Sequence, residues 1–440
     1  MEVRAVEVGA GTQAAAHEAP APRVSARAAG VAGSEILRIA AEIRERVARG
    51  VPVCNLTVGD FKPAEFPIPA ALRDRIEAAL RQGETNYPPG GGVPALRESI
   101  CILYREWLGR DCTPESVLVT AGVRPGIYAA YHVLVDPGDR AVFPVPSWNN
   151  TYYASLAGAR AVPLACGPET AFLPTPEQLE PALRGARLLV LNSPLNPAGT
   201  VLGEDALRAV CDLVVRENRR RAAYERPLYL LFDQVYWMLT FGATRHHDPV
   251  ALCPDVAPYT IVVDGISKAF AATGLRVGWA AGPPDVIRCM ADRTAHMGAW
   301  APRPEQVAVA GMLRAREEIA EYHAAMKLAV QRRLDALYRG ITAMRERGLP
   351  VDALAPAGAI YLSVRFALNG RTTPDGATLH TNEDIRAYLL RHAGLAAVPF
   401  QAFGVSGDDG WFRLSVGAVS MEEIDAMLPR LEEAVATLVG

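Results

Sequence analysis

Apolar residues in the central part of the chain fall in short continuous runs, separated by segments with helical spacing. The runs are residues 117–120, 140–145, 187–191, 228–232 and 261–263. Helical periodicity appears between several of them, as in residues 125–135 and 204–218. Strands that are buried on both faces of a sheet carry apolar residues without alternation. The pattern therefore predicts an α/β protein whose central sheet is mostly parallel and flanked by helices.

The two ends of the chain show a different pattern. Apolar residues recur at helical spacing before Gly50, at Ile36, Ile39, Ile43 and Val47, and a short strand follows near residues 53–60. After Pro302 the pattern is helical to about Arg347, and strands follow near 359–364 and 411–416, with a closing helix from Met421. We predict a large domain over residues 63–314 and a smaller α+β domain built from residues 26–62 and 315–440.

Composition narrows the class of protein. The chain has 440 residues, of which 50% are hydrophobic and 21% charged, and its net charge is −3. This balance predicts neither a nucleic-acid partner nor a membrane partner. No apolar run approaches the roughly 18 residues of a membrane-spanning helix. Residues 1–25 are rich in Ala and Gly, carry both signs of charge and lack a continuous apolar stretch, which predicts a disordered leader.

Cysteine and histidine positions do not predict a metal site. The seven cysteines are scattered, odd in number and without a CxxC spacing, so neither a zinc site nor a disulfide framework is expected. Buried thiols in a reducing cytoplasm are the simplest interpretation. His246, His247 and Asp248 could suggest a metal, but adjacent side chains face different ways, which favours a surface turn before Pro249.

Polar clusters follow directly after several of the predicted strands. These clusters are Thr120–Gly122, Asn192–Asn196, Asp233–Tyr236 and Ser267–Lys268. In open α/β sheets, ligands bind outside the carboxyl ends of the strands. We therefore expect the four clusters to converge on one site.

Lys268 is the residue in these clusters with the most specific chemistry. A lysine at a strand end, backed by apolar residues, can lose water and have its pKa lowered. Its neutral amine can then form a Schiff base with an aldehyde, as in enzymes that use pyridoxal 5′-phosphate (PLP). Taken alone, Lys268 fits a solvated surface lysine better than a catalytic one, and the neighbouring clusters reverse that preference.

The other clusters supply groups that PLP requires. Asp233 suits the ring nitrogen of the cofactor, while Asn196 and Tyr236 suit its phenolic oxygen. Each has a structural alternative: a cap for Asp233, a turn for Asn196 and a core position for Tyr236. The strand-to-helix junction at residues 121–125 offers free backbone N–H groups to a phosphate. The chain contains neither GxGxxG nor GxxxxGK[ST], which argues against dinucleotides and nucleoside triphosphates.

Three motifs together resemble those of the class I/II aminotransferases, PLP enzymes of fold type I similar to aspartate aminotransferase. Asn192-Ser-Pro-Leu-Asn-Pro-Ala-Gly-Thr200 is similar to the family's NxPxNPTG motif, and Asp233-Gln-Val-Tyr236 to DE[IV]Y. Residues 267–278 are similar to SKxFxxxGxRxG. The order and spacing also match, and the resemblance runs from about Ser25 to the C-terminus. It implies a large PLP-binding domain and a smaller α+β domain.

The resemblance implies a role for each matching residue around the cofactor ring. Lys268 would bind PLP covalently and move the proton during catalysis. Asp233 would pair with the pyridinium nitrogen, and Asn196 and Tyr236 would hold the phenolic oxygen. Trp148 would stack on the ring.

Further residues match phosphate-binding and substrate-binding positions of the family. The residues at phosphate-binding positions are Gly122, Val123, Arg124, Ser267 and Arg276. Tyr87 matches a tyrosine that reaches the phosphate of a partner subunit, which implies a homodimer with shared active sites. Arg413 and Asn196 would bind the substrate α-carboxylate, with Gly59 bordering the substrate.

The chain departs from the family pattern at several positions. Gln234 stands where Glu is usual, Ala198 where Thr is usual, and Gly265 where a Ser often contributes a phosphate contact. We find no second arginine for the distal carboxylate of a dicarboxylic substrate. With Ile360 and Trp300 expected near the pocket, an apolar or aromatic amino donor is as compatible as aspartate.

The sequence thus predicts a cytoplasmic, homodimeric PLP aminotransferase that works by a ping-pong mechanism. It would move the amino group of an α-amino acid to a 2-oxo acid, which the family resemblance suggests is 2-oxoglutarate or pyruvate. The same motifs also fit another fold type I enzyme, such as a C–S β-lyase or an amino acid racemase. A PLP-binding module without turnover is the third alternative.

Overall fold

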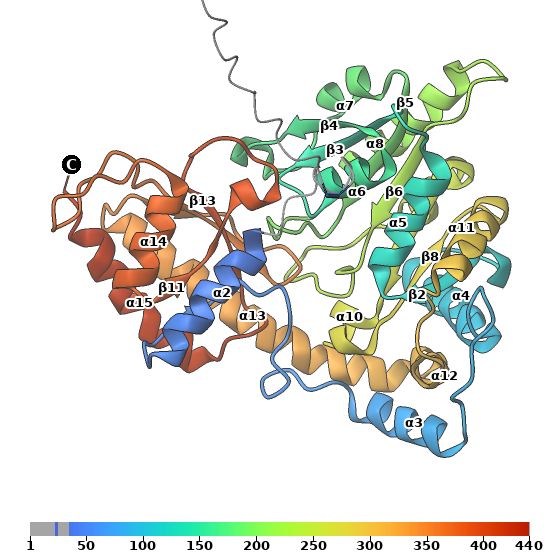
Figure 1. Ribbon diagram of the computed structural model, residues 1–440, viewed down its shortest axis with the longest axis horizontal. Coiled ribbons are helices and arrows are strands. Elements are labelled where there is room, and N and C mark those ends of the chain that lie inside the picture. The colour runs from blue at the N-terminus through green and yellow to red at the C-terminus, as the bar shows by residue number, and fades with distance from the viewer. Residues whose placement is uncertain (1–22, 25–34, 440) are drawn as a thin grey trace, which may run out of the picture. The chain divides into compact units, whose positions relative to one another are not determined.

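The computed structural model describes residues 23–24 and 35–439 (Figure 1). Except for Arg23 and Val24, the predicted leader over residues 1–25 lies outside the described residues. Residues 35–439 pack as one compact unit that contains a seven-stranded, a four-stranded and a two-stranded sheet.

The elements follow one another as the apolar pattern predicts. The α-helices are α2 (Glu35–Ala48), α3 (Ala70–Arg81), α4 (Pro94–Leu108), α5 (Val123–Leu134), α6 (Asn150–Ala157), α7 (Pro176–Leu183), α8 (Glu204–Arg220), α9 (Pro249–Leu252), α10 (Ile266–Ala269), α11 (Pro284–Met297), α12 (Arg303–Arg314), α13 (Arg316–Glu346), α14 (Asn382–His392) and α15 (Met421–Ala436). The strands are β1 (Cys54–Asn55), β2 (Val117–Ala121), β3 (Arg140–Val145), β4 (Arg160–Ala165), β5 (Ala186–Asn192), β6 (Tyr229–Asp233), β7 (Thr260–Gly265), β8 (Val277–Ala281), β9 (Val351–Ala353), β10 (Tyr361–Phe366), β11 (Leu395–Ala396), β12 (Val398–Pro399) and β13 (Trp411–Ser415).

The seven-stranded sheet confirms the predicted fold class. Its strand order is β2-β8-β7-β6-β5-β3-β4, and all neighbours are parallel except those of β8, which pairs antiparallel with β2 and β7. Two of its strands were not predicted. β4 lies at an edge, contains Pro163 and has no buried residue, whereas β8 is short and rich in Gly and Ala.

Helices cover both faces of this sheet (Figure 1). Alternate residues of β5 show the two faces: Leu188 and Val190 pack with α5, α6 and α11, while Leu189 and Leu191 pack with α7 and α8. This alternation arises because successive strand residues point to opposite faces. Burial on both faces explains why β5 is apolar throughout.

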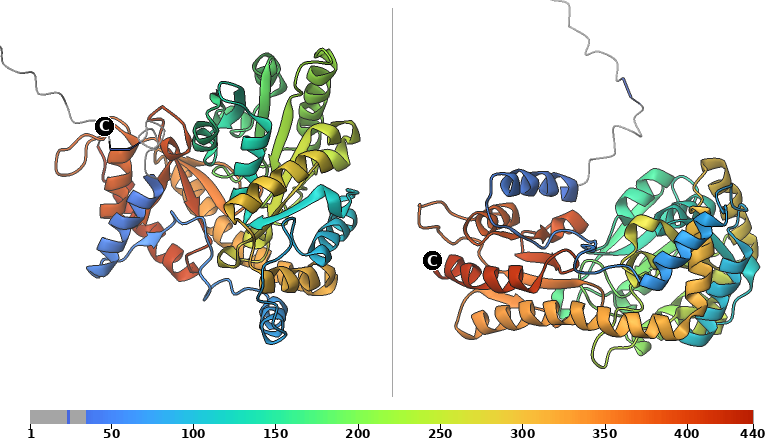
Figure 2. Two further views of the ribbon diagram at one scale, coloured as in Figure 1. Left: turned by 45° about the vertical axis from the view of Figure 1, so that its right-hand side comes forward. Right: turned by 90° about the horizontal axis from the view of Figure 1, so that it is seen from below.

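A second layer of structure is built from both ends of the chain. The four-stranded antiparallel sheet has the order β12-β13-β10-β9, and β1 pairs with β11. The long helix α13 runs from α12, beside the large sheet, to β9 and β10 (Figure 2). Because residues 35–439 form one compact unit, the predicted domain boundaries at 62/63 and 314/315 remain predictions.

Two predicted helices differ in detail from the structure. α5 begins at Val123, so the predicted start at Pro125 was wrong by two residues. Proline is tolerated there because the N–H groups of the first helical turn have no partner within the helix. In α2, Ile39 and Ile43 pack against Leu390 and Ala396, but Val47 is exposed.

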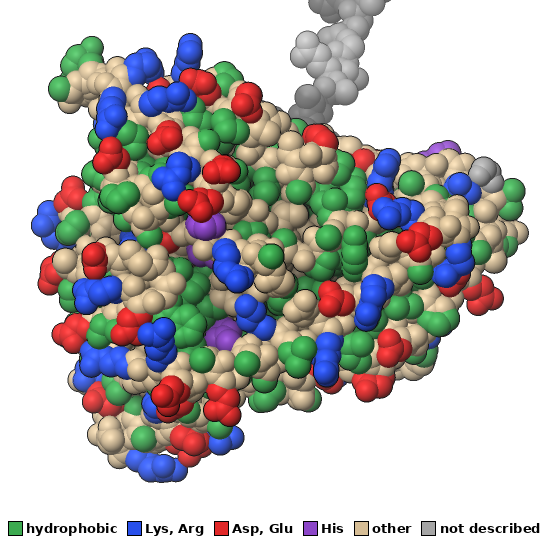
Figure 3. All heavy atoms as spheres, turned by 180° about the vertical axis from the view of Figure 1, so that it is seen from behind, with side chains coloured by type: hydrophobic (Ala, Val, Ile, Leu, Met, Phe, Trp, Pro, Cys, Tyr) green, Lys and Arg blue, Asp and Glu red, His purple; other side chains and the backbone are tan. Residues whose placement is uncertain are grey.

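Surface charge agrees with the near-neutral composition. Basic and acidic side chains are interspersed over the face drawn in Figure 3 rather than gathered by sign. Among the described residues, no helix has the length and hydropathy that crossing a membrane requires.

Two glycines allow β8 to approach the start of α5. A Cβ atom on Gly278 would lie 2.6 Å from backbone atoms of both Gly122 and Val123. Backbone atoms, unlike the end of a flexible side chain, cannot rotate away from such a contact. The absence of a side chain at position 278 therefore sets the distance between the sheet and the first turn of α5.

We expect Gly278→Ala to lower the free energy of unfolding by about 1–3 kcal/mol, because the added methyl group overpacks a backbone contact. Chemical denaturation would measure the change. Gly274→Ala is the matched control, since a Cβ there meets nothing within 4 Å. Equal stability of the two variants would contradict this account.

Candidate active site

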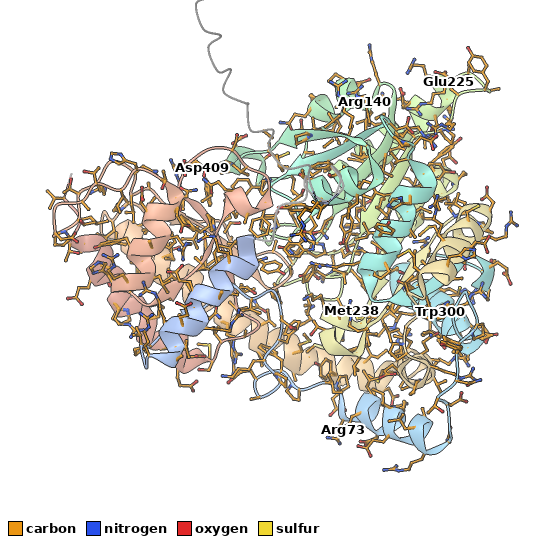
Figure 4. All side chains as sticks on the ribbon, viewed as in Figure 1. Arg73, Arg140, Glu225, Met238, Trp300 and Asp409 are labelled. Carbon is orange, nitrogen blue, oxygen red and sulfur yellow. The ribbon has the colours of Figure 1, made fainter. Side chains whose placement is uncertain are left out.

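Residues of three of the four predicted polar clusters line one cavity of about 460 Å³ at the carboxyl ends of the parallel strands. The fourth cluster, Thr120–Gly122, does not line it, but the next residues, Val123 and Arg124, do. Arg140, labelled in Figure 4, is the first residue of β3 and therefore marks the amino ends of the parallel strands, away from the cavity. The predicted residues in the cavity wall are Gly59, Val123, Arg124, Trp148, Asn196, Asp233, Tyr236, Ser267, Lys268, Arg276 and Arg413. The convergence expected from strand direction is therefore observed for three of the four clusters.

Lys268 lies in the single turn of α10, directly after β7. Its Nζ donates a hydrogen bond to the Gly59 carbonyl at 2.5 Å and lies 5.9 Å from the ring centroids of Phe61 and Tyr236. Desolvation lowers the pKa of Lys268 to about 8, against the opposing effect of Asp60. A substantial fraction of this amine is therefore neutral near pH 7 to 8, as a nucleophile requires.

Asp233 ends β6, the strand that pairs in parallel with β7. One of its carboxylate oxygens accepts a hydrogen bond from the Val235 backbone at 3.0 Å. Burial raises the pKa of Asp233 to about 6, opposed by that hydrogen bond and by Lys268. The carboxylate is thus mostly ionised at neutral pH and can hold a proton on a basic ring nitrogen.

Two tyrosine hydroxyls meet beside this carboxylate. The hydroxyls of Tyr236 and Tyr361 lie 2.5 Å apart, and both side chains are buried. Burial raises the pKa of Tyr236 well above its usual value, so the hydroxyl remains a proton donor.

Arg413 is buried without an acidic partner. Its side chain is 1% exposed, and no acidic group among residues 35–439 forms an ion pair with it. It donates to the Asn196 side-chain oxygen at 3.1 Å and to the Thr57 carbonyl at 2.5 Å, while its Nε has no partner. Burial lowers the pKa of Arg413. A buried guanidinium that faces a cavity in this way is suited to bind a ligand carboxylate.

The first turn of α5 and Arg276 form a second anion-binding region. Gly122 precedes the helix with a φ of 81°, a conformation that favours glycine. A Cβ atom at Gly122 would lie 2.1 Å from the Arg276 guanidinium, so the lack of a side chain also makes room for that group. Free backbone N–H groups and a cation together suit a phosphate.

Trp148 and Arg124 lie next to one another in the cavity wall. The Arg124 guanidinium carbon is 5.1 Å from the Trp148 ring centroid. The Trp148 ring is also 6.3 Å from the ring of Phe403. No acidic side chain among the described residues pairs with Arg124.

Some residues expected near the pocket do not line the cavity. Tyr87 is 81% exposed and stacks edge-on against Trp300, with ring centroids 5.4 Å apart. Trp300, labelled in Figure 4, is likewise absent from the cavity wall. The expectation that Ile360 faces the pocket was wrong: Ile360 is fully buried, and its neighbour Tyr361 lines the cavity.

The cavity also contains residues that the sequence analysis did not assign. They are Val58, Asp60, Ile127, Asn192, Val235, Thr273 and Tyr361. Most lie within or beside the quoted motifs, so the signal was proximity in the sequence. Asp60 and Thr273 come from distant segments, yet the Thr273 hydroxyl donates to the Asp60 carboxylate at 2.6 Å.

The histidine pair forms no metal site. No cluster of metal-ligating side chains occurs in the described part of the chain. Asp248 caps α9 through the N–H groups of Val250 and Ala251, and His246 Nε2 lies 3.1 Å from the side-chain oxygen of Gln234.

Comparison with known proteins gives the family. Residues 51–431 match the family model "Aminotransferase class I and II". The chain belongs to this family. It is 31% identical over 413 residues to a probable aspartate/prephenate aminotransferase of Thermus aquaticus, covering 93% of this chain and 99% of the relative. It is 29% identical to the aspartate aminotransferase of Geobacillus stearothermophilus, covering 93% and 98%.

Solved structures agree with this assignment. The crystal structure of the Rhizobium meliloti aspartate aminotransferase matches with a TM-score of 0.86 and 29% identity, covering 95% of this chain and all of that one. This protein is therefore a PLP-dependent aminotransferase, which moves an amino group from an amino acid to a 2-oxo acid. The predicted enzyme class, cofactor and fold type are confirmed.

The residues of the cavity fit PLP. A side chain at position 122 would fill the space that the Arg276 guanidinium takes, and the region provides N–H groups and positive charge for a phosphate. Lys268 offers an amine and Asp233 an ionised carboxylate on other sides of the same cavity. Bound PLP supplies an aldehyde and an electron-accepting ring.

We expect covalent capture of PLP by the cofactor-free protein to slow about tenfold for each pH unit below about 8, because only the neutral amine of Lys268 reacts. Above that pH the rate should level off. Stopped-flow absorbance would measure it, and borohydride trapping would identify the modified residue.

Lys268→Ala should abolish the trapped adduct. Lys327→Ala is the control, since Lys327 is a half-buried lysine on α13 that does not line the cavity. A trapped adduct in Lys268→Ala, or a capture rate independent of pH below 8, would contradict the assignment.

Proposed function

We propose that this aminotransferase acts on acidic amino acids such as aspartate, and that Arg413 and Arg124 bind the two carboxylates of the substrate. The observation that carries the proposal is the pair of guanidinium groups in one cavity, neither of which has an acidic partner in the described structure. Two relatives named as aspartate aminotransferases, from Geobacillus stearothermophilus at 29% identity and Rhizobium meliloti at 30%, support it.

Arg413 suits the α-carboxylate, which every amino acid substrate carries. Its forked donors are held by Asn196 and by the Thr57 carbonyl, and the rings of Tyr361 and Phe403 lie 4.8 and 4.9 Å from its guanidinium carbon. A fixed planar guanidinium favours two parallel hydrogen bonds to a carboxylate. Gly59 borders the same space, since a Cβ there would lie 2.9 Å from the Tyr361 hydroxyl.

Arg124 suits the distal carboxylate. Its backbone lies in the first turn of α5, where its N–H can serve the phosphate as the family resemblance implies, but its side chain extends over Trp148. Gly122, Val123, Ser267 and Arg276 would hold the phosphate, which would leave the Arg124 side chain for a second anion. Ile360 and Trp300, on which the expectation of an apolar or aromatic amino donor rested, do not line the cavity. This favours an acidic substrate over an apolar one.

The remaining roles follow from the chemistry of the groups. Lys268 Nζ would hold the cofactor, and the same amine would move the proton at the substrate Cα. The Asp233 carboxylate would hold a proton on the ring nitrogen, while Asn196 and Tyr236 would donate to the phenolic oxygen and Trp148 would stack on the ring. The amino donor leaves as a 2-oxo acid before the acceptor 2-oxo acid binds, in a ping-pong order.

We also propose a cytoplasmic homodimer in which Tyr87 completes the partner's site. The high exposure of Tyr87 and its stacking on Trp300 support an interface position for this aromatic pair. All seven cysteines are free thiols, which is typical of a reducing compartment.

Arg124→Gln should reduce kcat/KM for aspartate by about 10- to 100-fold, the equivalent of one charged hydrogen-bonding interaction. Activity with phenylalanine should remain or rise, because no distal carboxylate is present. Half-reactions with each amino acid, followed by absorbance, would give kcat/KM for aspartate and for phenylalanine. Arg124→Lys is the matched control, since it retains the charge and should retain most aspartate activity. Equal losses with both amino acids would contradict the assignment and indicate a role in cofactor binding.

Mixed dimers test the shared site. Chains carrying Lys268→Ala should be inactive as homodimers, and chains carrying Tyr87→Ala should bind PLP weakly. A heterodimer of the two would contain one site with both residues intact, so activity should reappear when the chains are mixed and reassociated. If mixing restores nothing beyond the Tyr87→Ala activity, Tyr87 does not serve the partner's site.

A further inference from the structure

Two cysteines outside the active site lie in direct contact. Cys101 belongs to α4 and Cys112 follows that helix, and their sulfur atoms are 2.6 Å apart. The contact arises because α4 ends at Gly109, whose φ of 67° reverses the chain and returns residue 112 to the side of the helix. Cys101 is buried and Cys112 is half-buried.

The two thiols differ in acidity. The hydrogen bond with Cys101, aided by the charges of Arg110 and Arg105, lowers the pKa of Cys112. The same hydrogen bond and burial raise the pKa of Cys101. The thiolate is the reactive form of cysteine, and the lowered pKa favours it at Cys112 rather than at Cys101.

Cys112 is also the accessible member. It lines an open surface pocket of about 260 Å³ together with Arg110, Ser116 and Gly282, and this pocket shares no residue with the wall of the active-site cavity. Cys101 does not line the pocket and is only 5% exposed. A small oxidant entering from solvent would meet Cys112 first.

We propose that Cys101 and Cys112 form a peroxide-reactive dithiol that closes to a disulfide. The Cys112 thiolate attacks one oxygen of hydrogen peroxide, the O–O bond breaks, and a sulfenic acid forms while hydroxide leaves and takes up the thiol proton as water. The Cys101 sulfur then attacks the Cys112 sulfur, the S–O bond breaks, and a second water leaves. Two thiols are oxidised and one peroxide is reduced to two waters.

The two sulfur atoms are already close to bonding distance. A disulfide requires the two sulfur atoms to approach by about 0.6 Å from their present separation. The bond would fasten the segment after α4 to the helix. That segment contains Arg110, whose guanidinium pairs with Asp248 at 3.2 Å and lies 5.3 Å from the Tyr104 ring. β2 follows directly and leads to Gly122.

Peptide mapping of the PLP-loaded enzyme tests the proposal. Trypsin cleaves after Arg105 and Arg110, so the two cysteines fall in separate peptides that only a disulfide would join. After treatment with one equivalent of hydrogen peroxide and alkylation, we expect this joined pair and the loss of two alkylatable thiols, both reversed by dithiothreitol.

Three variants serve as controls. Cys112→Ser and Cys101→Ser should each abolish the joined peptides, whereas Cys289→Ser should not, because Cys289 is an exposed thiol elsewhere, on α11. The proposal is overturned if both cysteines remain alkylatable while Cys289 is oxidised, or if the oxidised pair involves another cysteine.

Thermal unfolding gives a second measurement that does not depend on mass. If the disulfide forms with little strain, the midpoint temperature of thermal unfolding should be about 2–4 °C higher for the oxidised enzyme than for the reduced enzyme. Cys112→Ser should show no such difference between the two conditions. A fall in the midpoint on oxidation would overturn the proposed fit.

Discussion

The site depends on the burial of two side chains that carry positive charge, those of Lys268 and Arg413. Removing a charge from water costs several kcal/mol unless nearby groups replace the lost hydration. Here the replacement comes largely from one short backbone segment: the Thr57 carbonyl accepts from Arg413, and the Gly59 carbonyl accepts from Lys268. Carbonyl oxygens stabilise a cation less than a carboxylate does. Both side chains therefore retain affinity for an anionic or electrophilic ligand.

This requirement explains why the site needs more than one sheet. Lys268 and Asp233 lie at the carboxyl ends of β7 and β6, whereas Arg413 belongs to β13 and the segment 57–59 follows β1. Neither set alone encloses a cavity. The long helix α13 packs with β9 and β10 of the small sheet and with α12, which packs with β8 of the large sheet. It therefore connects the part of the structure that contains Arg413 with the part that contains Lys268 and Asp233.

The sequence predicted what depends on local pattern and missed what depends on tertiary placement. Continuous apolar runs identified β5, β6 and β7, and strand direction alone predicted that Asn196, Asp233 and Lys268 converge. Ile360 was expected at the pocket, but Tyr361 is there, because a shift of one residue along a strand exchanges the two faces. No local pattern specifies that choice. Spacing likewise gave no sign that Cys101 and Cys112 meet, since their contact depends on the chain reversal at Gly109.

The departure at Gln234 can be explained by the same charge argument. Gln234 is fully buried, and its side-chain oxygen lies 3.1 Å from His246 Nε2. Burial lowers the pKa of His246 to about 4, so the imidazole is neutral at physiological pH and can donate to an amide oxygen. A glutamate at position 234 would place a second buried carboxylate next to Asp233 and would require a cationic partner. The neutral Gln–His pair avoids that charge, so the negative charge beside the ring-nitrogen position stays on Asp233.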